Sequence, residues 1–303
     1  MTISFKDRVA IVTGAGGGLG RAYALELGKR GAKVVVNDLG ASRDGTGHSD
    51  AALKVVEEIR AAGGEAMANG GSVTEFAQME EMVAKAKEKW GGVHVLINNA
   101  GILRDRTFVK MTMEDFDLVV QVHLMGSANC TKAVWDLMRE QNYGRILMTA
   151  SSTGLFGNFG QSNYGAAKLG LAGLTKTLAL EGAKYNVRVN TLAPVAGTRM
   201  TEDLGMPEAF FHALAPENVA PMALFLVSED APTNVIAGAG AGAYHAAYVT
   251  LTPGIALPPA ERTPEGIAAH WAEITDRTGE IVPQSGAEQS QVVMQALGKL
   301  AQD

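Results

Sequence analysis

"RVAIVTGAGGGLGRA", residues 8–22, begins with a short β-branched run that passes directly into a glycine-rich loop. A run of this kind is typical of a buried parallel strand. Gly14 permits a tight turn, Gly18 lets the backbone approach a pyrophosphate, and Gly20 lets the next helix pack closely on the strand. Because a helix N-terminus presents unpaired N–H groups to phosphates, the stretch predicts a strand, a phosphate-binding loop and a helix.

The same alternation continues along most of the chain. It implies right-handed crossovers and predicts an α/β, doubly wound Rossmann fold with a mainly parallel sheet, in which ligands bind beyond the carboxyl ends of the strands. The expected strands are 8–14, 32–38, 93–99, 144–150 and 187–193, and the expected helices are roughly 18–30, 50–62, 74–89, 113–140, 163–183 and 216–228.

Three regions depart from this alternation. Residues 39–50, "LGASRDGTGHSD", predict a mobile loop between the second strand and its helix. Residues 235–251 predict one last strand with glycine turns, and residues 263–274 predict a helix with Pro264 at its first position. We therefore expect a single domain with a C-terminal extension that packs on the core or on a partner subunit: 1–252 for the domain and 253–303 for the extension.

Composition narrows the class of protein. The 303 residues suit one large α/β domain, and 47% apolar with 19% charged residues is globular rather than disordered. A net charge of −6 lacks the basic footprint of a nucleic-acid binder, and no apolar run is long enough to cross a bilayer. The single cysteine, Cys130, predicts core filling rather than a disulfide, and no two histidines have the spacing of a helical metal site. With no signal peptide, and with a C-terminus "LAQD" that is no peroxisomal address, the sequence predicts a cytoplasmic location.

A carboxylate follows the glycine loop at the distance expected for a ribose ligand. Asp38 ends the run "VVVND" about twenty residues on. It can accept hydrogen bonds from both ribose hydroxyls and would repel a 2′-phosphate, so it favours NAD over NADP. Arg21 and Arg43 lie nearby in sequence and could reduce the discrimination against NADP. We therefore expect a preference for NAD rather than its exclusive use.

Tyr164 and Lys168, in "YGAAK", share one face of an expected helix because they are four residues apart. A free tyrosine has a pKa of about 10 and is a poor base at neutral pH. A nearby ammonium stabilises the phenolate and predicts a lowered pKa for Tyr164. Ser151 ends the expected fifth strand thirteen residues earlier (164 − 151), a separation that lets the chain return over the sheet edge.

Taken together, TGAGGGLG (13–20), Asp38, NNAG (98–101), Ser151 and YGAAK (164–168) resemble the short-chain dehydrogenase/reductase family, and the resemblance covers about residues 5–250. It implies that Tyr164 is the acid/base, that Ser151 holds the substrate oxygen, and that Lys168 lowers the pKa of Tyr164 and binds the nicotinamide ribose. The residues implied at the NAD site are Gly14, Gly18, Leu19, Gly20, Asp38, Ser72, Val73, Asn99, Tyr164, Lys168, Ala196 and Thr198.

Several residues depart from the family pattern. Ser72 stands where many relatives carry an aspartate, and Val195 replaces the usual glycine after proline. His123 takes the place of an asparagine that completes a proton-relaying tetrad in many members. As a catalytic residue His123 would anchor a water; the alternative is a buried histidine bonded to backbone.

These departures point to one subgroup. "NDLGASRDGTG", "GILRDRTF", "GNFGQSNY" and "APVAGTRMTED" are similar to the dehydrogenase domain of peroxisomal multifunctional enzyme type 2, which acts on (3R)-hydroxyacyl-CoA and on 17β-hydroxysteroids. The resemblance implies an NAD-dependent (3R)-3-hydroxyacyl-CoA dehydrogenase; the alternatives are a 17β-hydroxysteroid or other secondary-alcohol dehydrogenase, and a cofactor-binding regulator that no longer catalyses. By the same analogy, apolar faces on helices 113–140 and 163–183 imply a homodimer or homotetramer.

The substrate region is expected beside the nicotinamide end. Residues 199–215 predict a lid, in which Met200 contacts substrate together with Ser151 and Tyr164, although its apolar side chains also suit a helix core. Arg104 and Arg106 could meet CoA phosphates or form a structural ion pair with Asp105 or a neighbour.

Overall fold

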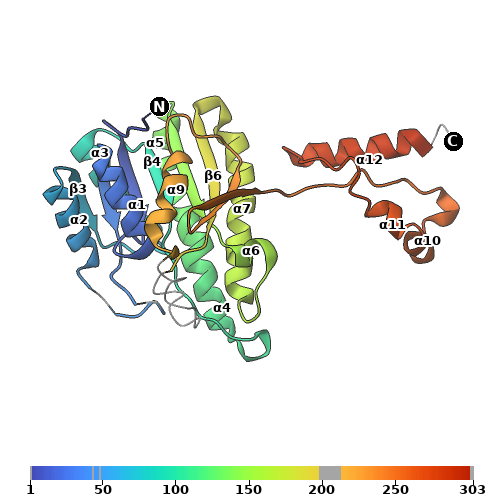
Figure 1. Ribbon diagram of the computed structural model, residues 1–303, viewed down its shortest axis with the longest axis horizontal. Helices are drawn as coiled ribbons and strands as arrows, with labels where there is room; N and C mark the ends of the chain where they lie inside the picture. The colour runs from blue at the N-terminus through green and yellow to red at the C-terminus, as the bar shows by residue number, and fades with distance from the viewer. Residues whose placement is uncertain (1, 43, 48, 198–212, 301–303) are drawn as a thin grey trace. The chain divides into compact units, whose positions relative to one another are not determined.

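In the described part of the chain, eight strands form one sheet in the order β3-β2-β1-β4-β5-β6-β7-β8 (Figure 1). The computed structural model describes residues 2–42, 44–47, 49–197 and 213–300. All neighbouring strands from β3 to β7 pair in parallel. The chain runs outward in opposite directions from the adjacent pair β1 and β4, which is the switch point where such folds bind ligands. The strands are β1 Val9–Thr13, β2 Lys33–Asn37, β3 Glu65–Asn69, β4 Val95–Asn98, β5 Gly144–Thr149, β6 Val187–Pro194, β7 Ile236–Gly240 and β8 Ala243–Ala247.

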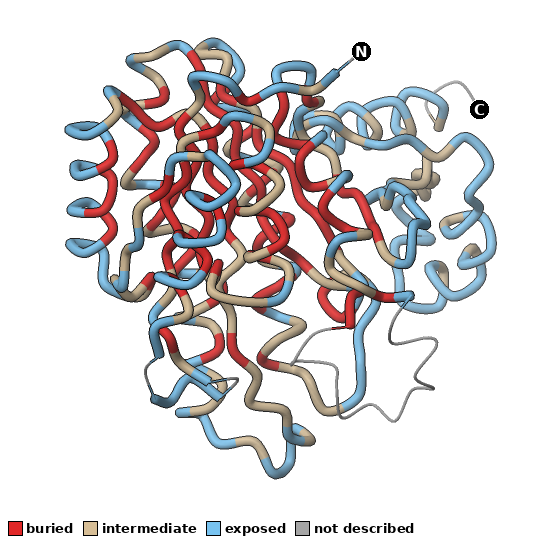
Figure 2. Tube along the Cα trace, turned by 60° about the vertical axis from the view of Figure 1, so that its left-hand side comes forward, coloured by how far each residue is buried: buried red, intermediate tan, exposed pale blue. Residues whose placement is uncertain are grey.

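Helices cover both faces of the sheet, as the expected Rossmann fold requires. Along β1 the side chains alternate: Ala10 and Val12 pack with α1, α2 and α9, whereas Val9 and Ile11 pack with α3, α5 and α7. Figure 2 shows the buried residues concentrated along the strands between these layers. The helices of this part are α1 Gly18–Lys29, α2 Ala51–Ala61, α3 Phe76–Trp90, α4 Met113–Val120, α5 Gly126–Glu140, α6 Ser152–Phe156, α7 Ser162–Gly182 and α9 Ala220–Phe225.

The long helix expected over 113–140 contains a π-helical turn, Gln121–Met125, between α4 and α5. Thr112 caps its start, because the side-chain oxygen accepts a hydrogen bond from the Asp115 N–H at 3.1 Å. A π-helical turn inserts one residue into the helical repeat and is frequent at functional sites. The turn carries His123, and it therefore decides where this side chain points.

Other elements differ from the expected ones for local reasons. The edge strand β3 has a mixture of exposed and buried residues, so it lacks the continuous apolar run that identified the central strands. The single strand expected over 235–251 is the pair β7 and β8, joined by a two-residue turn in which Ala241 and Gly242 have φ of 50° and 78°. Residues 216–228 form a 3₁₀ turn, Pro216–Asn218, followed by the short helix α9.

The chain divides into two compact units, Met1–Ala246 and Ala247–Asp303. The second unit contains α10 Pro264–Ala269, α11 Trp271–Ile274 and α12 Gly286–Leu300, so the helix expected over 263–274 is interrupted at His270. Pro264 does occupy the first helical position, after the cap Thr263. From 247 to 300 every residue is at least partly exposed. The packing of this extension stays a prediction.

Within the described ranges, no helix is both long and apolar enough to cross a membrane.

Candidate active site

The glycine loop between β1 and α1 needs its glycines for space. Gly14 has a φ of 63°, and a Cβ there would lie 2.8 Å from Cα of Ala100; a Cβ on Gly20 would lie 2.3 Å from the Gly14 carbonyl oxygen. Asn99 fastens the loop to the end of β4, because its Nδ2 donates to the carbonyls of Thr13 (3.1 Å) and Gly14 (3.2 Å). The backbone is thus held open at the start of α1, as a phosphate-binding loop requires.

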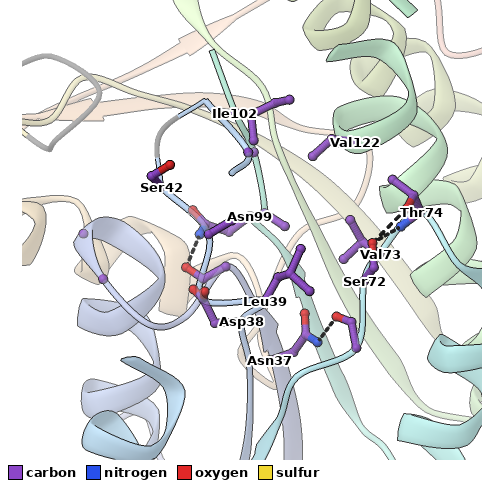
Figure 3. Close-up of a pocket in the computed structure, with 18 of the residues that line it drawn as sticks. Asn37, Asp38, Leu39, Ser42, Ser72, Val73, Thr74, Asn99, Ile102 and Val122 are labelled. Carbon is purple, nitrogen blue, oxygen red and sulfur yellow. Dashed lines mark hydrogen bonds between the residues drawn. The ribbon is translucent and has the colours of Figure 1, made fainter. Parts of the chain in front are cut away.

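Asp38 follows β2 and faces this loop (Figure 3). Its two carboxylate oxygens accept hydrogen bonds from the N–H groups of Gly16 and Gly40, both at 2.7 Å. These two bonds fix the carboxylate beside the glycine loop, at the edge of the pocket described below. Arg21 is bound to Glu58, with Nε 3.2 Å from Oε1, so it is engaged elsewhere. Arg43 lies outside the described residues.

A pocket of about 310 Å³ opens along these elements. Its size and its mixture of apolar walls and a few polar groups suit part of a nucleotide ligand. At its far end the hydroxyls of Ser72 and Thr74 lie 2.8 Å apart. The predicted cofactor residues that line it are Gly14, Gly18, Leu19, Asp38, Ser72, Val73 and Asn99.

The remaining predicted cofactor residues lie elsewhere. Gly20 packs behind the loop, and Ala196 is buried beyond the end of β6. Tyr164 and Lys168 are not part of the pocket lining. Thr198 and Met200, with most of the expected lid, fall outside the described residues. The structure therefore brings together the adenosine and phosphate half of the expected cofactor site.

Asp44, in the loop 39–50, forms hydrogen bonds with its neighbours, and the mobility expected of this loop stays a prediction. Hydrogen bonds from Ser42 and Thr46 lower the pKa of Asp44 to about 2. Nε of Arg104 donates to the Asp44 carbonyl at 2.9 Å, and the Arg104 guanidinium pairs with Asp115 at 3.2 Å. Of the two interpretations of Arg104, the structure supports the structural ion pair. The partner is Asp115.

Ser151, Tyr164 and Lys168 meet at the carboxyl end of β5. Ser151 caps α6 and accepts from the Thr153 N–H at 3.2 Å. Tyr164 lies in the first turn of α7, and Lys168 follows one turn later, with its Nζ 5.4 Å from the centre of the Tyr164 ring. The Lys168 Nζ donates to the Thr149 carbonyl at 2.5 Å. The predicted shared helical face is present.

Burial dominates the electrostatics of this trio. Desolvation raises the pKa of Tyr164 to about 12, against the lowering effect of a hydrogen bond with Ser151, and Asp105 raises it further. Desolvation also lowers the pKa of Lys168 to about 7. The pKa of Tyr164 is thus raised rather than lowered in this structure, because burial penalises its charged form. That Lys168 favours the phenolate stays a prediction.

His123 is buried between β4 and α7. Its Nε2 lies 2.8 Å from the carbonyl oxygen and 3.2 Å from the nitrogen of Ile102. Its ring is perpendicular to that of Tyr164, with the centres 5.1 Å apart. Burial and the nearby Lys168 hold the pKa of His123 well below its usual value, so the ring is neutral. The sequence left two possibilities for His123, a side chain that anchors a water or a buried histidine bonded to the backbone. The contacts of Nε2 agree with the second.

Two side chains that sequence reasoning missed form hydrogen bonds at the start of α7, where Tyr164 lies. The Asn163 side chain accepts from the Tyr164 N–H at 2.7 Å and donates to the Arg104 carbonyl at 3.1 Å. The Gln161 side chain accepts from the Thr153 hydroxyl at 2.9 Å and donates to Asp105 at 2.7 Å. The only signal was a polar run directly before "YGAAK", which any exposed helix start would also show.

Comparison with known proteins agrees with this arrangement. A family model described as short chain dehydrogenase matches residues 8–208. Peroxisomal multifunctional enzyme A of Dictyostelium discoideum is 47% identical over 305 residues, which cover 100% of this chain and 68% of that protein. A short-chain type dehydrogenase/reductase of Mycobacterium tuberculosis is 50% identical over 278 residues, covering 90% of this chain and 96% of that one.

Solved structures extend the comparison. Full-length peroxisomal multifunctional enzyme type 2 from Drosophila melanogaster matches with a TM-score of 0.83 and 38% identity, over 98% of this chain and 51% of that one. A 7α-hydroxysteroid dehydrogenase complexed with NADH and 7-oxo glycochenodeoxycholic acid matches with a TM-score of 0.71 and 29% identity, over 79% of this chain and 95% of that one. This chain thus spans about half of the solved multifunctional enzyme.

These relatives correct one prediction. The expectation of a cytoplasmic location is contradicted, because relatives from Dictyostelium, yeast, mouse and fly are named as peroxisomal enzymes. The expectation rested on the last residues, "LAQD". Because such an address is a short terminal motif and the chain matches only part of these longer proteins, that motif carries no weight here.

Proposed function

The chain belongs to the short-chain dehydrogenase family, and from that premise we propose that it oxidises (3R)-3-hydroxyacyl-CoA to 3-oxoacyl-CoA with NAD. One observation carries the proposal. Ser151, Tyr164 and Lys168 meet at the end of β5, in a chain 47% identical over its whole length to a peroxisomal multifunctional enzyme. The preference for NAD is supported by Asp38, whose carboxylate is held at the pocket rim by Gly16 and Gly40.

The residues of the trio have distinct roles in this proposal. NAD, when bound, supplies the acceptor for the hydride from C3 of the substrate. The Ser151 hydroxyl holds the C3 oxygen, and the Tyr164 phenolate takes the hydroxyl proton, leaving a ketone. Lys168, fixed by the Thr149 carbonyl, lies on the Tyr164 side of the site to bind the nicotinamide ribose and to favour the phenolate. Because burial raises the pKa of Tyr164, oxidation should accelerate as the pH rises.

A second candidate substrate is a 17β-hydroxysteroid or another secondary alcohol. The match to a solved hydroxysteroid dehydrogenase favours it, and the catalytic groups themselves recognise only the carbinol. The remaining alternative is a cofactor-binding regulator that no longer catalyses. It is not supported, because the site retains Ser151, Tyr164 and Lys168.

Assembly forms part of the proposal. Leu118, Met125, Leu169 and Leu180 are exposed apolar side chains on α4, the π-helical turn and α7, and they support a homodimer or homotetramer through this face. The extension also supports further packing, since none of its described residues is buried. Light scattering on the purified chain would give the mass. A monomer would refute this part alone.

The test measures the rate of NADH or NADPH formation with a panel of substrates. It compares a (3R)-hydroxyacyl-CoA, its (3S) epimer and a 17β-hydroxysteroid, each with NAD and with NADP. We expect fast turnover of the (3R) thioester with NAD. Turnover of the steroid alone would transfer the assignment to the second candidate, and no turnover of any compound would refute the proposed reaction.

A further inference from the structure

His123 is in contact with a wall of the pocket that contains Gly101. The π-helical turn places its imidazole in the interior, where 1% of the residue is exposed. A Cβ built on Gly101 would lie 2.3 Å from Cε1 of His123, and its three nearest neighbours would all be imidazole atoms. Gly101 does not have a positive φ. The space that it leaves is therefore required by the imidazole.

The same imidazole is bound to the next residue of that wall. Its Nε2 reaches both backbone polar atoms of Ile102, at 2.8 Å and 3.2 Å. Gly101, Ile102 and Val122 all line the pocket, and Figure 3 shows Ile102 and Val122 on the part of it away from Asp38. Anchoring to Ile102 thus fixes the ring relative to the proposed cofactor site.

The ring also contacts the catalytic tyrosine. The two ring planes are at 90° with centres 5.1 Å apart, which is the edge-to-face geometry that aromatic pairs prefer. Burial, and after it the charge of Lys168 on the same helix as Tyr164, holds the pKa of His123 well below its usual value and keeps the imidazole neutral. A neutral ring can hold this contact while the tyrosine changes its protonation.

We infer that His123 is a positioning residue, which holds the Tyr164 ring at a fixed offset from the pocket wall of Gly101 and Ile102. The inference rests on the proposed role of Tyr164 as acid/base. It differs from the role of a water-holding amide, because Nε2 is engaged by Ile102 and the contact with Tyr164 is made through the two rings. What reaches Tyr164 is the ring itself. A displacement of about 1 Å in a reacting group can cost about 10²-fold in rate.

Three substitutions distinguish the contribution of the His123 ring from that of its nitrogens. His123→Phe keeps a ring and removes the nitrogens, His123→Asn keeps an amide that can hold a water and removes the ring, and His123→Ala removes both. Positioning predicts that kcat falls by about tenfold or more in His123→Ala and His123→Asn, and by less in His123→Phe, with the KM for NAD changed by less than about threefold. Rates are expressed per active site, counted by NADH titration. If His123→Asn retains as much kcat as His123→Phe, the inference is overturned.

Gly101→Ala gives an independent test that does not alter His123. The new methyl group must displace the imidazole, so kcat should fall as it does in His123→Ala. The double variant Gly101→Ala/His123→Ala should have a kcat no lower than His123→Ala alone, because the methyl group then meets no ring. A wild-type kcat in Gly101→Ala would refute the positioning role. All variants are assayed with whichever secondary alcohol the wild type turns over, so that a wrong substrate assignment and a wrong role for His123 give different results.

Discussion

Replacing Lys168 by methionine should stabilise the fold while it removes activity. Lys168 is buried with 3% of its surface exposed, and in the described part of the chain its Nζ donates to the Thr149 carbonyl. Burial lowers its pKa from 10.5 to about 7. The unfolded chain therefore binds more protons than the folded chain between these two values, and the stability of the wild type rises with pH across this window.

The two pKa values set the size of the effect. Protonation of Lys168 favours the unfolded state by ~4 kcal/mol at pH 7 and by ~2 kcal/mol at pH 9. Methionine has a similar length and no charge, and it loses the bond to Thr149, which offsets about 1 kcal/mol. The variant should thus be more stable than the wild type by ~3 kcal/mol at pH 7 and by ~1 kcal/mol at pH 9.

Urea unfolding at the two pH values measures this difference directly. Lys176→Met, on the same helix but partly exposed, is the matched control for replacing a lysine of α7 by methionine. We expect kcat of Lys168→Met to fall by about 10²-fold or more. A Lys168→Met variant that is less stable than the wild type at pH 7 would refute the reasoning. So would a difference in the free energy of unfolding that does not become smaller at pH 9.

Further substitutions test the cofactor site, the core and the substrate. Asp38→Asn removes the acceptor for the ribose hydroxyls, so the KM for NAD should rise about tenfold with little change in kcat, and steady-state kinetics with NAD and NADP should show a weaker preference. Arg145 is fully buried and donates to the carbonyls of Gly144, Asn186 and Ser228, so Arg145→Met should lower the free energy of unfolding by about 3 kcal/mol, measured in urea, without changing kcat. The Arg106 side chain is exposed, and among the described residues its guanidinium donates to the adjacent Asp105 carbonyl. Arg106→Ala should therefore raise the KM for a CoA thioester severalfold and leave a free hydroxysteroid unaffected; an equal effect on both would contradict a CoA contact.

Much of the fold could be predicted because its signals are local. The run before Gly14 and the apolar runs of the central strands are buried on both faces, so their sequences are distinctive. The shared face of Tyr164 and Lys168 follows from spacing within one helix. The edge strand β3 was missed because its residues are partly exposed.

The properties that failed prediction depend on residues far apart in the sequence. The pKa values of Tyr164 and Lys168 follow from burial in the folded chain, and burial reverses the direction that spacing alone suggested for the tyrosine. The contact of His123 with Gly101 joins residues on different elements, and a π-helical turn that no periodicity indicated sets its direction. The ion pair expected between Arg104 and Asp105 or a neighbour is formed with Asp115, on the following helix α4.

The central claim is that Tyr164 moves the proton during hydride transfer. The most direct measurement compares wild type and Tyr164→Phe for NADH formation from a (3R)-hydroxyacyl-CoA, with NADH affinity measured on the same samples. We predict that kcat falls by about 10³-fold or more while the dissociation constant for NADH stays within about threefold. A Tyr164→Phe enzyme that binds NADH and retains the wild-type rate would contradict the mechanism.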